Sequence, residues 1–249
     1  MLTTIQYNSR KLQIDLSKPL DISIPLRAST DNVNAWYIYE PKITPVKTEE
    51  GIIAVSEGAS VNFNTIEFNP HAHGTHTECL GHITPKLYSV NQQLKQFFFL
   101  AEVISVAPET FNGDKIISQK QLQFALGNKK RDALVIRTLP NTDEKLSRQY
   151  SHTNWPYLKD EAMSYLVKKG INHLLIDLPS VDRERDNGEL KGHHIFWNMN
   201  GRKRYGSTIT EFIYVPNHVE DGTYFIDLHV APFENDAAPS RPVLYKVLN

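Results

Sequence analysis

The segment Glu67-Phe-Asn-Pro-His71-Ala-His73-Gly-Thr-His76-Thr-Glu78-Cys-Leu-Gly-His82-Ile-Thr-Pro85 holds four of the chain's ten histidines within twelve positions. Neutral imidazole and carboxylate groups are the usual nitrogen and oxygen ligands of divalent transition metals. A loop with scattered surface histidines rarely concentrates them in this way, so the segment predicts a metal site. The candidate ligands are His71, His73, His76, Glu78 and His82.

The local backbone of this segment favours a shared ligand face. If residues 75–78 are extended, His76 and Glu78 point to the same side, because strand side chains alternate with a period of two. Gly74 permits a close approach of the backbone, and Thr75 carries a hydroxyl that can orient a ligand. A metal ion could therefore bridge His76 and Glu78.

The run from His73 to His82 resembles the signature of the cyclase/kynurenine formamidase family, whose usual form is His-x-Gly-Thr-His-x-Asp-x-Pro-x-His. Gly74, Thr75, His76 and His82 are in register with it. Glu78 takes the place of the family's aspartate, and a leucine replaces its proline.

One departure affects the ligand set directly. Ala72 occupies the position of the family's first histidine ligand, and His71 and His73 flank it. A shift of one residue in the backbone could bring either histidine to the metal, and the sequence leaves both possibilities open.

Two further segments extend the resemblance. His193-His194-Ile-Phe-Trp resembles the family's second histidine motif, with His193 in the better register and His194 as the alternative. The segment from Thr208 to Tyr214 matches the place where the family carries a glutamate, which here is Glu211. The resemblance implies that both segments supply metal ligands.

Composition excludes several classes of function. The net charge is −1 with both signs intermixed, which predicts neither a nucleic-acid partner nor a membrane partner. No apolar stretch approaches the length of a membrane span, and the first residues do not resemble an export signal. The single cysteine, Cys79, excludes an internal disulfide and fits a cytoplasmic location. Cys79 is interpreted as a small buried residue rather than a nucleophile.

The order of elements predicts an α/β fold. Strands are expected within residues 11–26, and at 51–54, 61–68, 97–106, 132–139 and 171–178, with a final strand within 221–244. Helices are expected after Ser118 and over 160–170. No linker or long repeat is present, so residues 1–249 are predicted to form one domain. The family resemblance implies a cyclase-like, swivelling β/α domain with a mixed β-sheet core and flanking helices.

The loop after residue 178 is a second candidate part of the site, because α/β proteins commonly bind ligands beyond the carboxyl ends of parallel strands. It contributes Ser180 and Asp182 as candidate substrate-binding residues. Turn formation and capping are the alternative interpretation of these residues. Trp36 lies in an irregular aromatic segment over 28–43 and is the third candidate, as an aromatic wall of a pocket.

These observations predict a metal-dependent hydrolase that uses one or two zinc or manganese ions, with His82 transferring the proton. The resemblance implies a small amide substrate, foremost an aryl formamide such as N-formylkynurenine or a related cyclic amide, and a homodimer or homotetramer. The alternative is a cyclase-fold binding protein whose metal site is structural or degenerate. Recruitment of His71 or His73 in place of Ala72 would discriminate between the two, because a site with fewer ligands retains metal less well.

Overall fold

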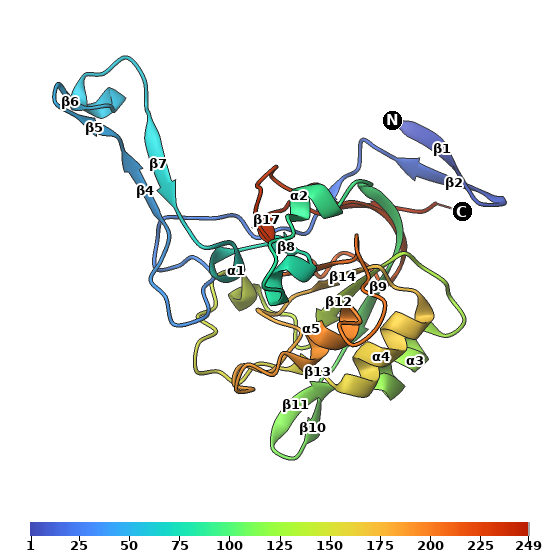
Figure 1. Ribbon diagram of the computed structural model, residues 1–249. Coiled ribbons are helices and arrows are strands. Elements are labelled where there is room, and N and C mark those ends of the chain that lie inside the picture. Colours follow the sequence, from blue (N-terminus) through green and yellow to red (C-terminus); the bar gives the residue numbers. More distant parts are fainter. Residues whose placement is uncertain (249) are drawn as a thin grey trace.

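A mixed nine-stranded sheet forms the centre of the computed structural model, which describes residues 1–248 (Figure 1). Its four central strands are parallel, and the strands on either side of them run antiparallel. The α/β prediction is confirmed. In spatial order the strands are β17 (Ala237–Pro239), β8 (His76–Glu78), β15 (Thr208–Glu211), β14 (His173–Ile176), β12 (Ala133–Thr138), β9 (Phe98–Val106), β16 (Gly222–Asp227), β18 (Val243–Lys246) and β3 (Leu20–Asp21).

Alternating side chains of the central strands fill two separate cores. In β12, Leu134 and Ile136 face one core, whereas Ala133 and Val135 face the other. The first core also receives apolar side chains of α3 (Gln119–Leu126), α4 (Asp160–Lys169) and α5 (Lys191–Phe196), which pack together on that face of the sheet (Figure 1). The short helices α1 (Pro70–His73) and α2 (Val90–Gln93) contact β17, and 3₁₀ turns lie at Val55–Glu57, Leu80–Ile83 and Asp143–Leu146.

The helix signals read from the sequence are borne out. Ser118 caps α3 in a capping box with Gln121, and Gly127 follows its last residue. In α4, Ala162, Met163 and Leu166 are buried against the sheet, and Val167, the fourth residue at helical spacing, packs there partly buried. No helix within residues 1–248 is long and apolar enough to cross a membrane.

The amino-terminal strands differ from the expectation that they begin the main sheet. β2 (Arg10–Asp15) pairs with β1 (Leu2–Tyr7) in a separate hairpin, and only the short β3 joins the nine-stranded sheet. Leu12 and Ile14 pack against Leu100 and Phe225 of that sheet. The hairpin therefore covers a face of the sheet chiefly through its apolar side chains, and the backbone N–H of Leu248, two residues after β18, donates to the carbonyl oxygen of Gln13 in β2 at 2.9 Å.

A β-ribbon projects from the body of the molecule (Figure 1). It consists of β4 (Lys42–Pro45) paired with β7 (Asn64–Glu67), and β5 (Lys47–Thr48) paired with β6 (Gly51–Ile52) towards the tip. Every residue of these four strands is exposed. The ribbon leads directly into α1 and the histidine segment. A smaller sheet of β10 (Glu109–Phe111), β11 (Asp114–Ile117) and β13 (Tyr157–Leu158) lies elsewhere on the body.

Candidate metal centre

The candidate site forms where β8 lies beside the carboxyl end of β15. The two strands are antiparallel, with His76 opposite Glu211 and Glu78 opposite Ile209. The loop that follows the neighbouring parallel strand β14 closes the same end, as expected for ligand sites in α/β folds. The predicted extended conformation of residues 76–78 is thus present, and both of its ligand-type side chains are fully buried.

Glu78 lies at the centre of the cluster. Its Oε1 is 3.1 Å from Nε2 of His193, and its Oε2 is 3.1 Å from Nδ1 of His71. Burial alone would raise the pKa of this carboxyl, but the electrostatic effect of nearby His82 and the contacts with His193 and His71 lower it well below its usual range. Glu78 is therefore an anion in a fully enclosed position, which is the state required of a metal ligand.

His76 and Glu211 face each other across the paired strands, with Nε2 of His76 3.5 Å from Oε2 of Glu211. The other carboxylate oxygen of Glu211 accepts a hydrogen bond from the backbone N–H of Val181 at 3.0 Å. Nδ1 of His76 contacts the carbonyl oxygen of Gly74 at 3.1 Å, which leaves Nε2 directed at the cluster. Phe212, directly after Glu211, has a left-handed backbone with φ 53°, a strained conformation of the kind that gathers at functional sites.

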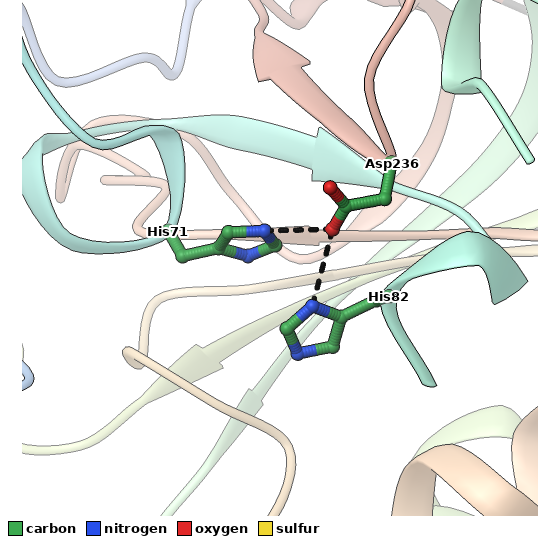
Figure 2. A group of neighbouring side chains, drawn as sticks. All are labelled: His71, His82 and Asp236. Carbon is green, nitrogen blue, oxygen red and sulfur yellow. Dashed lines mark hydrogen bonds and ion pairs between the residues drawn. The ribbon is translucent and has the colours of Figure 1, made fainter. Parts of the chain in front are cut away.

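His71 and His82 share one carboxylate, that of Asp236 (Figure 2). Oδ2 of Asp236 is 2.9 Å from Nε2 of His71 and 3.2 Å from Nδ1 of His82. Burial would lower the pKa of His71, but its bonds to Asp236 and Glu78 outweigh that effect and raise the pKa to about 10. The same two histidines hold the pKa of Asp236 below its usual range, against the effect of burial.

His193 is held by Asp182. Its Nδ1 lies 2.6 Å from Oδ2 of Asp182, and the backbone N–H groups of Gly192 and His193 donate to the same carboxylate at 2.7 and 3.2 Å. Nε2 of His193 is consequently turned towards Glu78. Burial opposes a charged ring here, yet Asp182 and Glu78 together raise the pKa of His193 well above its ordinary value. His194, the alternative in the sequence, is outside this contact network and partly exposed.

The structure brings His71 into the cluster and leaves His73 outside it. Nδ1 of His73 accepts a hydrogen bond from the backbone N–H of Asn69 at 2.8 Å, and its Nε2 contacts the carbonyl oxygen of Tyr39 at 2.8 Å. Both ring nitrogens are therefore engaged away from Glu78. Side chains two positions apart on a helix point to nearly opposite sides, so only one of the two histidines of α1 can reach the cluster.

His82 lies in the 3₁₀ turn that follows β8, and its approach to the cluster depends on the preceding glycine. A Cβ at Gly81 would lie 2.1 Å from the backbone oxygen of Tyr88, so no other residue fits without moving the backbone. Cys79 is fully buried and its thiol donates to the same oxygen at 3.0 Å. Burial raises the pKa of Cys79 to about 12, which supports its interpretation as a structural residue.

A cavity of about 260 Å³ opens onto the cluster. It is lined by His71, His82, His193 and Glu211, and its other walls are formed by Trp36, Ile38, Asn69, Ser180 and Leu190. The hydroxyl of Ser180 accepts from the backbone N–H of Asp182. Asp182 is instead turned towards His193. Of the candidate substrate-binding residues, Trp36 and Ser180 thus line the cavity, and Asp182 supports a histidine.

The donor set fits a divalent cation. Nε2 of His76 and Oε2 of Glu78 are buried, and neither makes a hydrogen bond with acceptable geometry to residues 1–248. Buried polar atoms without a partner are rare and call for an explanation, which a bound cation supplies. Three overlapping groups have ligand atoms within 4.8 Å of one another: His71, His82 and Asp236; His71, His76 and Glu78; and Glu78, His82 and His193.

Asp236 was not among the ligands expected from the sequence. It begins the run Asp236-Ala-Ala-Pro-Ser-Arg241, which resembles the closing segment of the family. It lies immediately before β17, the strand paired with β8, so its side chain reaches histidines more than 150 positions earlier. Its place in that closing segment was the one signal available.

A mixed α/β sheet carrying an enclosed group of histidines and carboxylates defines a protein built to bind a divalent metal ion beside a small cavity. Residues 14–183 match the family described as "Putative cyclase", so the chain belongs to the cyclase family.

Curated relatives and solved structures agree with this assignment. Kynurenine formamidase of Bacillus cytotoxicus is 29% identical over 230 residues, covering 92% of this chain and 97% of the relative. Isatin hydrolase A of Labrenzia aggregata shares the fold, with a TM-score of 0.67, 12% identity and coverage of 92% and 93% of the two chains. A structure described as a potential metal-dependent hydrolase with cyclase activity has a TM-score of 0.65 and 17% identity, covering 92% and 98%. These relatives support a hydrolase of the cyclase family.

Proposed function

We propose that this protein is a metal-dependent hydrolase of a small amide, with aryl formamides such as N-formylkynurenine, or related cyclic amides, as its substrate class. The observation that carries the proposal is the enclosed cluster around Glu78, in which two buried ligand atoms make no hydrogen bond of acceptable geometry to residues 1–248, beside a cavity walled by Trp36. The naming of the curated relatives as kynurenine formamidases supports the formamide class.

Five residues would hold zinc or manganese in this proposal: His71, His76, Glu78, His193 and Glu211. Glu78 belongs to two of the overlapping donor groups, which supports a site for one ion or for a pair. A bound divalent ion supplies a nucleophilic water at neutral pH and polarises the substrate carbonyl.

His82 is the proposed proton-transfer residue. Asp236 engages its Nδ1, which leaves Nε2 directed away from that carboxylate (Figure 2). A carboxylate on one ring nitrogen fixes the tautomer in which the other nitrogen is free to accept a proton. His82 would take a proton from water as the water oxygen attacks the carbonyl carbon, and return it to the amine nitrogen as the C–N bond breaks. For an aryl formamide the products are formate and the aryl amine.

The shape of the cavity supports a flat, apolar substrate. Trp36, Ile38 and Leu190 provide apolar surface beside the polar cluster. The Trp36 indole is fixed because its N–H donates to the carbonyl oxygen of His71 at 3.0 Å. An aryl group resting on this wall would have its amide over the cluster.

The test is metal content and turnover of an aryl formamide, measured on the same preparations of wild type, Glu78→Gln and a control, Glu189→Gln. Glu189 is an exposed residue paired only with Lys191 among residues 1–248. Wild type and the control should contain metal and release formate, and Glu78→Gln should lose both. Equal metal content in all three would overturn the metal site. Metal retention with no turnover of any formamide or cyclic amide would favour the binding-protein alternative.

A further inference from the structure

The turn that carries Trp36 has an unusual backbone. Trp36 and Tyr37 are consecutive residues with positive φ, at 64° and 61°. Bulky L side chains rarely adopt this left-handed region, and two in succession persist only where surrounding contacts hold them. The contacts that hold this turn therefore determine where the wall of the cavity stands.

Glu184 supplies one of these contacts, beside the hydrogen bond from the backbone N–H of Tyr37 to Oγ of Ser151 at 2.9 Å. One carboxylate oxygen accepts hydrogen bonds from the hydroxyl of Tyr37 at 2.6 Å and from the backbone N–H of His152 at 2.5 Å. The other accepts from the backbone N–H of Asn154 at 2.7 Å. Burial would raise the pKa of Glu184, but these bonds lower it, which keeps the acceptor ionised at neutral pH. The Glu184 side chain thus joins its own loop to the turn of Tyr37 and to the segment of His152 and Asn154.

The loop that carries Glu184 also contacts the metal centre. Two positions before it, Asp182 holds His193, and the carbonyl oxygen of Asp182 accepts from the indole of Trp155 at 3.0 Å. Trp155 in turn packs edge-on against Trp36, with 5.0 Å between the ring centroids. Asp182 therefore both supports His193 and, through Trp155, contacts the Trp36 wall of the cavity. Glu184, two residues later in the same loop, connects this loop to the turn of Trp36 and Tyr37 from outside the cavity.

The geometry points to Glu184 as a positioning residue that sets the selectivity of the cavity for aryl groups, by fixing the turn of Trp36 and Tyr37 against the loop of residues 182–186. Glu184 does not line the cavity and does not contact the cluster. Its effect is on the placement of Trp36, and the consequence for substrates depends on the function proposed above.

Tryptophan fluorescence measures the placement of the wall without any substrate. The chain has three tryptophans, of which Trp155 and Trp197 are 1% and 0% exposed, whereas Trp36 is partly exposed. Acrylamide quenching therefore reports chiefly on Trp36. In Glu184→Ala the quenching constant should rise about twofold, since a turn that has lost the hydrogen bond of the Tyr37 hydroxyl opens locally more often.

Two further variants make the measurement specific. Tyr37→Phe keeps the aromatic ring, which packs on His152, and removes only one of the three bonds to Glu184. It should fold even if Glu184→Ala does not, and should give a smaller rise in quenching. Glu189→Ala, on the same loop and paired with Lys191, is the matched control and should leave quenching unchanged. Wild-type quenching in Tyr37→Phe and in a folded Glu184→Ala would overturn the proposal.

The activity measurement compares an aryl formamide with an alkyl formamide. Glu184→Ala should raise KM for the aryl substrate on the order of tenfold, with kcat little changed, because the wall is misplaced while the reacting groups are intact. The alkyl substrate should show no such change. Equal effects on both substrates would contradict a role in selectivity. If wild type cleaves neither compound, the proposed function fails, while the quenching result still decides whether Glu184 holds the turn.

Discussion

Replacement of Asp182 by asparagine should weaken metal binding without unfolding the protein. The carboxylate of Asp182 engages Nδ1 of His193 at 2.6 Å and accepts from the backbone N–H groups of Gly192 and His193. An asparagine of nearly the same shape keeps one acceptor oxygen and places an NH₂ group opposite hydrogen-bond donors. The ring of His193 then loses the anionic partner that orients Nε2 towards Glu78.

The expected magnitude follows from the position of Asp182 behind a ligand. Loss of such a supporting hydrogen bond typically raises the metal dissociation constant about 10- to 100-fold, which is about 1.4 to 2.7 kcal/mol. The effect should lie towards the upper end of this range, because Asp182 is buried with 6% exposure and solvent cannot replace it. Its contacts with two backbone N–H groups add to this, since both belong to the start of α5, which carries His193.

Competition with a chromophoric chelator gives the dissociation constants of wild type, Asp182→Asn and a control, Asp160→Asn. Asp160 is an exposed residue in the first turn of α4. Circular dichroism of the same samples tests the fold. Wild-type affinity in a folded Asp182→Asn would refute the reasoning, because it would show that His193 needs no support from Asp182 to bind the ion.

Three further predictions concern other parts of the chain. His82→Ala should lower kcat about 10²- to 10⁴-fold with metal content retained if His82 transfers the proton; loss of metal together with activity would make it a ligand, and full activity would exclude both roles. Burial, with a smaller effect of Arg204, lowers the pKa of His173 from 6.5 to about 4, so as pH falls the unfolded chain takes up this proton first. Wild type should therefore lose about 3 kcal/mol in its free energy of unfolding between pH 6.5 and 4 that His173→Gln does not lose. Urea unfolding at each pH measures this, and an equal loss in the two proteins would contradict the prediction. Light scattering should show a homodimer or homotetramer, because the projecting ribbon exposes apolar side chains such as Phe63 (58%) and Ile66 (54%); a monomer at micromolar concentration would contradict it.

Local signals in the sequence were sufficient for much of the secondary structure. Ser118 and Gly127 predicted the ends of α3, because capping depends on residues within one turn of the helix. The shared face of His76 and Glu78 followed from the period of a strand over three residues. The histidine segment likewise indicated metal-binding chemistry, since its donors are close together in the chain whatever the rest of the fold does.

Three features depended on the tertiary structure. The choice of His71 over His73 is made by Asn69 and Tyr39, which engage the ring of His73, and by Asp236, which engages that of His71. The ribbon of β4 and β7 projects although its sequence resembles ordinary strands, because nothing in a short alternating pattern specifies whether a hairpin packs on the body.

The assembly of the complete site is the clearest case. His193, Glu211 and Asp236 are each separated from Glu78 by more than 110 residues, and only the pairing of β8 with β15 and β17 brings Glu211 and Asp236 to it. Taken from sequence alone, each is a polar residue of a kind that usually faces solvent. Short-range patterns therefore determine which donors are available, whereas the order of strands in the sheet decides which of them meet.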